Sequence, residues 1–536
     1  MKKILYITLL SFTLIQLFSC SKKKDYLEMI PSDTDFVVQI NPKSIAEKAD
    51  FNSIEQYQLA NSLITTLNNT DPALKELVSK IKESPSSAGV DLISPIYIFG
   101  KKVNHKVISS LIMNMNNKSD FEEQLKTIYK ATYKKEINFI DENGYTFIEG
   151  NKKPFIAWNK KQFIFIAGEY GTKNSTLTAY FDELIKNEKP LIKNLNFAEF
   201  VKKSEDINIW YTGTFFNYMF NENKDHVDLS NCSWSNYISF NNNNISFVQE
   251  FNPDPQAKIF FSKHPLWKKR INTDFYKYIP EKSYLNFSFA LYPQNINTIF
   301  NENSAITNQL NDYNIDLEML KNSAEGDVIF SVFELDKIQS FNMNNYFKHK
   351  DSFKSYDIIP QFVFISKMKN DIFLNEMIKT FGKNIKKQGE YYIVAIGGNQ
   401  NLYIAYKNKL AYITNNYTQV NKFITNKIEK NNFLKSEYAG EAKNAMFFNA
   451  NLNLEDYSDD TKNYIYRQIP LGETPLVQTF LNQFSKANFT ITNDFTKKGS
   501  VTLKNQKGNS LQTILTFLDQ AYVLYTNPQM ESYESN

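Results

Sequence analysis

The chain has 536 residues, a length that corresponds to three or four domains at about 150 residues each. Apolar residues make up 42% of it and charged residues 22%, with sixteen glycines and sixteen prolines. This composition is typical of globular proteins with a core and excludes a collagen-like or low-complexity chain. The net charge of +4 gives no indication of a nucleic-acid partner, because phosphate binding needs clustered positive charge. The arginines are Arg270 and Arg467 alone, so bidentate contacts to phosphate or carboxylate are almost unavailable.

The N-terminal residues predict a secretion signal. Met1-Lys2-Lys3 is a short positive segment, and residues 4–18 form a mostly apolar run of 15 residues. Such a run matches the apolar core of a signal peptide and is shorter than the roughly 20 residues that a spanning helix requires.

The apolar run ends in Leu17-Phe18-Ser19-Cys20, which resembles the lipobox of bacterial lipoproteins. The resemblance implies cleavage before Cys20, which would carry thioether-linked diacylglycerol and a third acyl chain on its amine. Several acyl chains anchor a protein stably without spanning the bilayer. An ordinary signal peptide with an incidental cysteine, or an uncleaved anchor, are the alternatives. The sequence therefore predicts residues 1–20 as a signal peptide and residues 21–29 as a tether.

The residues after Cys20 bear on the location of the anchor. Ser21 replaces the aspartate of the usual inner-membrane retention signal, which favours the outer membrane. Surface-exported lipoproteins of Bacteroidota resemble one another in an acidic patch after the cysteine, whereas this chain has Lys22, Lys23 and Lys24. We therefore expect the periplasmic face rather than the cell surface, with the membrane as the partner of the lipid anchor.

Cysteine usage indicates a fold without disulfides. If Cys20 is acylated, Cys232 has no intramolecular partner. Cys232 has no histidine nearby in sequence, so a small buried apolar residue is a better interpretation than a nucleophile.

In the remaining sequence the same order of predicted strands and helices occurs twice, in residues 30–268 and 269–530. Ile30-Pro31 and Ile279-Pro280 each precede a strand, predicted at 36–40 and 284–289. Each copy then has helical segments, a long strand, a capped helix and an aromatic hairpin. Unrelated domains with a coincidentally similar order are the alternative.

The capped helices are predicted from side-chain periodicity. In the first copy, Ser119 and Glu122 form an apparent capping box. Its predicted apolar face consists of Phe121, Leu125, Ile128 and Tyr129. In the second copy, Asn370 can cap a helix whose predicted apolar face consists of Leu374, Met377, Ile378 and Phe381.

The hairpins are runs of aromatic and β-branched residues around short Asn/Lys turns. They are predicted at 155–158 with 163–166, and at 403–406 with 411–413. Further strands are expected at 145–148, 207–213, 245–251, 391–394, 445–452 and 501–504, and helices at 177–185 and 420–428. Residues 241–244 predict a hairpin turn, 252–255 a turn or linker, and 342–354 a polar loop. Adjacent strand pairs between amphipathic helices predict an α+β fold with two similar halves, each a mainly antiparallel sheet with helices packed on it.

The opening of the first copy resembles a family of Bacteroidota lipoproteins grouped as "domain of unknown function 4836". The similarity lies in Ile30-Pro31, the following strand, and the Lys43-Ser44 to Glu47-Lys48-Ala49 stretch. Residues 89–97 and 156–159 also resemble that family, and the likeness covers most of residues 25–525. The resemblance implies an uncharacterised envelope lipoprotein and brings no catalytic residues with it.

The sequence contains no local signature of catalysis, metal binding or cofactor binding. Its histidines, which stand apart among polar neighbours, are His105, His226, His264 and His349. No zinc spacing, nucleophile elbow, dinucleotide fingerprint or phosphate loop is present. The acids at 141–142 and 459–460 are interpreted as a turn and a helix start. Because glycosidases need only two carboxylates distant in sequence, an envelope hydrolase acting on glycan or peptide is kept as the alternative function.

Aromatic residues supply the candidates for a binding surface. Most of them occupy strand positions, where core packing is the commoner role. Trp210, Trp234 and Trp267 lie close in sequence at the end of the first copy and are the candidates for a ligand platform or interface. The sequence thus predicts a lipid-anchored, non-enzymatic binding or scaffolding protein of the envelope, with a protein or glycan partner, no cofactor and no nucleic acid. A deep cleft with converging acids would favour the hydrolase, and an exposed aromatic surface would favour binding.

The lipobox leads to a direct prediction about Cys20. Metabolic labelling of the expressing cells with a clickable palmitate analogue should tag the wild-type protein and leave Cys20→Ala untagged. Equal labelling of the two proteins would rule out acylation at this residue.

Overall fold

The structure is a computed structural model, and it describes residues 25–50, 53, 56–62, 65, 72–103, 105–149, 155–215, 228–296, 317–341, 354–397, 400–428, 430–471, 474–504 and 508–526. These residues form two compact units. Unit 1 contains the described residues before Lys48 together with Ala60–Phe215, and unit 2 contains Lys48–Leu59 and the described residues after Phe215. This division differs from the predicted repeat boundary at residue 268. The reason is that strands β9 (Ser233–Phe240) and β10 (Asn244–Asn252) pack within unit 2.

Unit 1 is an antiparallel sheet with the strand order β8-β1-β2-β3-β7-β6-β5-β4. Its strands are β1 (Phe36–Ile40), β2 (Ile96–Val103), β3 (Lys106–Asn114), β4 (Phe139–Glu142), β5 (Tyr145–Ile148), β6 (Phe155–Trp158), β7 (Gln162–Gly168) and β8 (Ile207–Thr212). Its helices are the 3₁₀ helices η1 (Asp25–Met29), η3 (Pro85–Ala88) and η4 (Leu191–Lys193), and the α-helices α2 (Pro42–Lys48), α4 (Pro72–Glu83), α5 (Lys118–Tyr133), α6 (Asn174–Ile185) and α7 (Leu195–Phe200).

Trp158 is the centre of a small core between the β4–β7 strands and α5. Its side chain is 0% exposed, and its ring contacts Phe121 of α5 and Phe139 of β4 edge to face. The indole Nε1 donates to Glu122 Oε1 at 3.0 Å, which satisfies the one polar group of a buried tryptophan.

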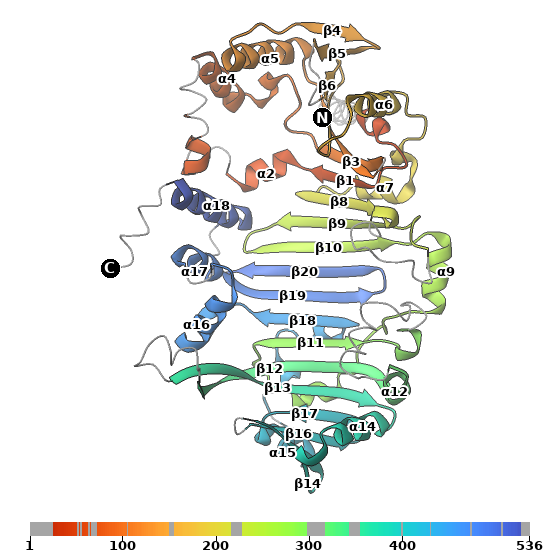
Figure 1. Ribbon diagram of the computed structural model, residues 1–536, viewed down its shortest axis with the longest axis vertical. Coiled ribbons are helices and arrows are strands. Elements are labelled where there is room, and N and C mark those ends of the chain that lie inside the picture. Colours follow the sequence, from red (N-terminus) through yellow and green to blue (C-terminus); the bar gives the residue numbers. More distant parts are fainter. Residues whose placement is uncertain are drawn as a thin grey trace, which may run out of the picture. The chain divides into compact units, whose positions relative to one another are not determined.

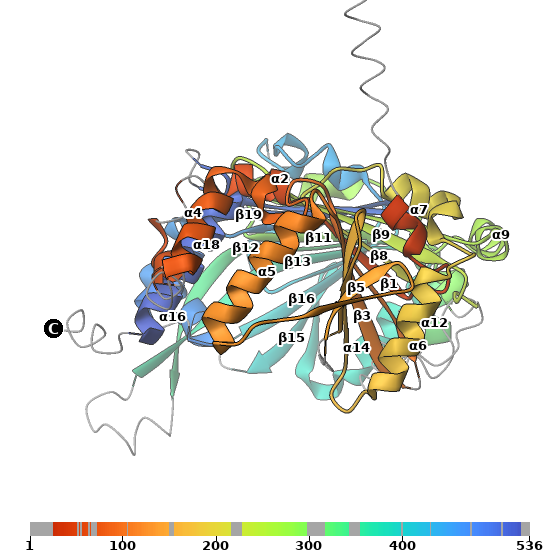
Figure 2. The same cartoon turned by 90° about the horizontal axis from the view of Figure 1, so that it is seen from above.

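Unit 2 is a larger antiparallel sheet, with the order β9-β10-β20-β19-β18-β11-β12-β13-β17-β16-β15-β14. Its remaining strands are β11 (Leu285–Ala290), β12 (Ala324–Phe341), β13 (Lys354–Met368), β14 (Ile385–Gln388), β15 (Tyr391–Gly397), β16 (Gln400–Lys407), β17 (Leu410–Thr414), β18 (Met446–Asn451), β19 (Phe484–Asn493) and β20 (Thr496–Leu503). Figure 1 shows the strands from β9 to β13 side by side in this order. One end of β12 and β13 projects beyond the neighbouring strands (Figure 2).

The helices of unit 2 lie on the sheet and at the strand ends. They are α9 (Pro255–Lys263), α12 (Leu317–Ser323), α14 (Ile372–Thr380), α15 (Tyr417–Ile424), α16 (Asp459–Gln468), α17 (Pro475–Leu481) and α18 (Ser510–Thr526), with the 3₁₀ helices η5 (Asp274–Tyr278), η6 (Pro293–Asn295), η7 (Gly382–Asn384), η8 (Phe433–Lys435), η9 (Glu441–Lys443) and η10 (Leu454–Asp456). Helices α16, α17 and α18 lie at one end of the strands, and α9 and α12 at the other (Figure 1). Phe423 of α15 stacks on Tyr412 of β17, with ring centroids 4.4 Å apart.

The prediction of mixed helices and strands with mainly antiparallel sheets is confirmed. The strand orders of the two units also correspond. Adding ten to each strand number of unit 1 gives β18-β11-β12-β13-β17-β16-β15-β14, which is a continuous part of the order in unit 2. In the aromatic hairpins, Ala157 lies opposite Ile164, and Ala405 lies opposite Tyr412.

The predictions for α5 need correction at its N-terminus and on its apolar face. The predicted capping box at Ser119 is wrong, because Asn117 caps α5 and accepts from the N–H groups of Ser119 and Asp120. Asparagine is among the strongest N-caps, and Glu122 is engaged by Trp158 instead. Ile128, which was expected on the covered face, is 43% exposed.

Other predicted turns have mixed outcomes. The turn between β9 and β10 is confirmed, with Asn241 N–H donating to Asn244 O. The segment expected as a turn or linker at 252–255 starts α9, where Asp254 accepts from Ala257 N–H at 2.7 Å. Of the predicted polar loop at 342–354, residues 342–353 lie outside the described residues.

Strands β11 and β18 at the centre of unit 2 have one buried and one part-exposed face. On β11 and β18, the buried positions hold Asn286, Ser288, Phe447 and Asn449, and Ala290 is buried at the end of β11. The large residues Phe287, Phe289 and Phe448 alternate with them and are part exposed. Because strand side chains alternate between faces, Phe287, Phe289 and Phe448 lie on the open face, and the covered face holds small polar side chains together with Phe447.

Adjacent phenylalanines on β18 provide a test of which face of the strand is covered. Phe447 is 0% exposed, so Phe447→Ala should lower the free energy of unfolding by about 3–5 kcal/mol. Phe448 is part exposed, so Phe448→Ala should cost roughly 1–2 kcal/mol, since less apolar area is returned to water. Urea denaturation measures both losses. An equal loss for the two variants would contradict the assignment of faces.

Candidate functional site

The face of unit 2 opposite its polar row is built from three rows of residues that lie directly opposite one another on neighbouring strands. The first two rows are part exposed, whereas the third includes the buried residues Asn236, Ile491 and Ser366. From β9 to β13, the first row consists of Ile238, Phe247, Gly499, Phe489, Phe448, Phe287, Phe330 and Phe364. The second consists of Phe240, Ile245, Val501, Ala487, Ala450, Leu285, Val332 and Phe362. The third consists of Asn236, Gln249, Lys497, Ile491, Met446, Phe289, Val328 and Ser366. We call these three rows the phenylalanine face.

The first two rows contain apolar residues and one glycine, and every member is part exposed. At the usual strand separation, eight strands extend over about 34 Å. Large contiguous apolar surfaces of this kind mark sites for apolar ligands or partners. Gly499 interrupts the first row, and a Cβ atom there would lie 3.3 Å from the Phe489 ring.

The residues that lie between the first and second rows along each strand point to the opposite face, and from β9 to β12 they are polar. The row consists of Ser239, Ser246, Ser500, Asn488, Asn449, Asn286 and Ser331. Asn286 Nδ2 donates to Asn449 Oδ1 at 2.8 Å, and Ser331 Oγ donates to Asn286 Oδ1 at 2.8 Å. These hydrogen bonds offset part of the cost of burying amides and hydroxyls. The polar face is therefore compatible with burial, whereas the apolar face is left partly in water.

The third row ends in a polar corner formed by Asn236, Gln249 and Lys497. Gln249 Nε2 donates to Asn236 Oδ1 at 2.8 Å. Lys497 lies opposite Gln249 on one side and Ile491 on the other. Burial lowers the pKa of Lys497, because the ammonium loses hydration without gaining a neighbouring negative charge.

The structure places the three predicted tryptophans in different surroundings. Trp210, in unit 1, is 2% exposed and contacts Phe197 edge to face. Trp234 is 8% exposed and stacks on Phe251 at 4.8 Å, one row beyond the polar corner. Neither ring forms an open platform. Trp267 is part exposed, and its backbone N–H donates to Asp494 Oδ1 at 3.1 Å.

The residues of the phenylalanine face were not identified as a site from the sequence. The sequence does contain a signal for this face, because large apolar residues alternate with polar ones along the strands, for example at Phe287 and Phe289. Alternation alone indicates two faces but does not say which face is covered. The default assignment of large aromatics to the core holds for Phe447 but not for Phe287, Phe289 and Phe448.

A concavity of about 870 Å³ lies at the edge of the polar face and is lined by Tyr284, Tyr438, Glu437, Asp456 and Lys486 among others. Glu437, Lys486 and Asp456 of this concavity have partners within the protein. Lys486 Nζ lies 3.0 Å from Glu437 Oε2 and holds the pKa of Glu437 below its usual range. Asp456 accepts from the amides of Asn451 and Asn453. A carboxyl with a lowered pKa is a poor general acid.

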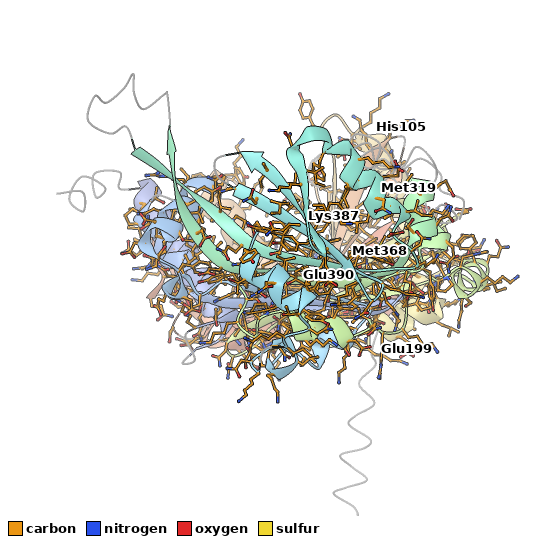
Figure 3. All side chains as sticks on the ribbon, turned by 90° about the horizontal axis from the view of Figure 1, so that it is seen from below. His105, Glu199, Met319, Met368, Lys387 and Glu390 are labelled. Carbon is orange, nitrogen blue, oxygen red and sulfur yellow. The ribbon has the colours of Figure 1, made fainter. Side chains whose placement is uncertain are left out.

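The remaining sequence candidates show no catalytic arrangement. Within the described ranges, no group of three or more His, Cys, Asp or Glu residues could hold a metal ion. His105 is exposed at the surface of unit 1 (Figure 3), whereas His226, His349 and Cys20 lie outside the described residues. Cys232 is 1% exposed, and burial raises the pKa of its thiol to about 11. It is therefore an unreactive buried residue.

Among the residues that the structure describes, no helix has both the length and the apolarity needed to cross a bilayer.

Comparison with known proteins places the chain in a family. The model of the domain of unknown function DUF4836 matches residues 26–511. No curated protein matches the chain. A solved structure entitled "Structure of crystal form I of TP0453" is similar over 45% of this chain and 84% of that one, with 10% identity and a TM-score of 0.24. Because the family model covers nearly all of both units, the chain belongs to the family of the domain of unknown function DUF4836.

Proposed function

We propose that this protein is a non-enzymatic binding protein of the cell envelope that holds an apolar ligand against the phenylalanine face. The observation that carries this proposal is the placement of Phe287, Phe330, Phe448 and Phe489 on the part-exposed side of their strands. Complete burial of a phenylalanine side chain contributes about 1.5–3 kcal/mol. On this face part of that free energy is unused by folding and is available to a ligand.

The proposal of binding is favoured over the alternative, an envelope hydrolase. A hydrolase needs a positioned acid, base or nucleophile. In the part of the chain that the structure describes, Glu437 of the concavity pairs with Lys486 and Asp456 accepts amide hydrogen bonds, and the phenylalanine face contains no acid. An apolar ligand fits this chemistry better than hydrolysis does.

The proposed location is the periplasmic face of the outer membrane, with Cys20 acylated. Its support is the lipobox of residues 17–20 and the absence of acidic residues directly after it. Several acyl chains would anchor the protein stably to the membrane. The same proposal includes that this chain is one of the Bacteroidota lipoproteins.

We further propose that the chain contains two copies of one ancestral unit. The support comes from equivalent strand orders and equivalent hydrogen bonds. Leu191 N–H donates to Ile30 O at 2.7 Å, and Phe433 N–H donates to Ile279 O at 2.9 Å. Trp158 packs in the cluster that contains Phe121 of α5, and Tyr406 packs in the cluster that contains Leu374 of α14. Both hairpin residues therefore point toward the corresponding helix.

The duplication predicts how sequences of family members align. When the two halves of each member are aligned with one another, β1 should match β11, β6 should match β16, and length differences should fall in loops. The alignment score against shuffled sequences is the measurement. A consistent match of β1 with any strand other than β11 would contradict a common origin.

The binding proposal predicts uptake of the neutral fluorescent probe N-phenyl-1-naphthylamine. The double variant Phe448→Ser/Phe489→Ser should weaken binding at least about tenfold, because each ring contributes more than 1 kcal/mol of apolar contact. Fluorescence titration of the intact protein measures the dissociation constant.

Two neighbouring residues of β10 supply a matched control. Phe247→Ser changes the phenylalanine face and should also weaken probe binding. Val248→Ser changes the opposite face of the same strand and should leave probe binding unchanged. Absence of probe binding by the wild type, or equal effects of the two substitutions, would overturn the proposed function.

A further inference from the structure

The phenylalanine face carries a single charged residue. Lys497 is the only ionisable side chain in its three rows. It belongs to β20 and points to the same side as Val501 and the gap at Gly499, because these residues alternate along the strand. Its neighbour Lys498 is exposed and lies on the opposite face.

Lys497 has no anionic partner in the described part of the chain. Its Nζ makes no hydrogen bond or ion pair there. Loss of hydration is the sole cause of its lowered pKa. A partly dehydrated cation without a counter-ion is costly. A ligand that brings a negative charge to this position would remove that cost.

The surroundings of Lys497 are polar on one side and apolar on the other. Gln249 and Asn236 continue the row toward β9, and their amides form a hydrogen-bonded pair at 2.8 Å. Ile491 and Met446 continue it toward β18. A ligand that fits has one anionic end, which accepts hydrogen bonds, and a long apolar remainder.

We propose that this corner binds the carboxylate of a long-chain fatty acid whose chain lies across the phenylalanine face. This inference rests on the proposed function and names its ligand class. One ammonium matches the single charge of a carboxylate. Each methylene of the chain placed against Ala487, Ala450 or the neighbouring phenylalanines gains about 0.8 kcal/mol when fully buried.

Competition for the bound probe tests the carboxylate site on the intact protein. Dodecanoate and 1-dodecanol have chains of equal length and differ in the charge of the head group. Dodecanoate should displace N-phenyl-1-naphthylamine from the wild type at an at least tenfold lower concentration than 1-dodecanol. In Lys497→Met, which keeps an unbranched side chain and removes the charge, the two compounds should compete equally.

Lys498→Met is the matched control, because it removes the neighbouring charge from the opposite face. It should retain the preference of the wild type for dodecanoate. Circular dichroism and the thermal midpoint of each variant establish that it is folded. If Lys497→Met does not fold, Lys497→Gln provides the same loss of charge.

The outcomes separate the two proposals. If the probe does not bind, the proposed function fails. If the probe binds but dodecanoate and 1-dodecanol compete equally with the wild type, or Lys498→Met alone removes the preference, the carboxylate site fails while the apolar site stands. Stronger competition by 1-lauroyl-lysophosphatidylglycerol than by dodecanoate would overturn the fatty acid in favour of a phospholipid.

Discussion

The alternation of side chains along β11 and β18 is the constraint on which the functional interpretation depends. Asn286 and Asn449 face the covered side, where Asn286 donates to Asn449 and accepts from Ser331. The same alternation directs Phe287 and Phe448 to the open side. A shift of one residue in register would exchange these faces, placing phenylalanine in the core and amides toward solvent. The hydrogen-bonded row therefore stabilises one register and, with it, the position of the phenylalanine face.

Continuity of the phenylalanine face comes from strands that are distant in the sequence. Phe247 of β10 lies in the same row as Gly499 of β20 and Phe489 of β19, although about 240 residues separate them. Antiparallel pairing of β10 with β20 joins two hairpins into one surface. This pairing also brings Lys497 beside Gln249, so the polar corner exists only when both hairpins are assembled. A chain with either hairpin alone would lack the site.

Charged groups with and without partners lie on different faces of unit 2. In the cleft on the polar side, Glu437 pairs with Lys486, and Asp456 accepts from two amides. On the open side, Lys497 has no such partner within the described residues. Compensated charges maintain structure, whereas an uncompensated charge beside an apolar surface is available for recognition. This difference favours the open side as the place where a ligand binds.

The sequence by itself determined the elements that depend on local chemistry. The strands at 36–40 and 155–158 and the turn at 241–244 follow from alternation, β-branched residues and turn-forming asparagines. The family likewise followed from short sequence motifs near the N-terminus. The sequence did not determine which residue caps α5, because Asn117 and Ser119 are both good caps, nor that Trp210 and Trp234 are buried. Only tertiary structure decided which face of unit 2 is covered, since period-two alternation is symmetric between the faces until helices and 3₁₀ segments pack against one of them.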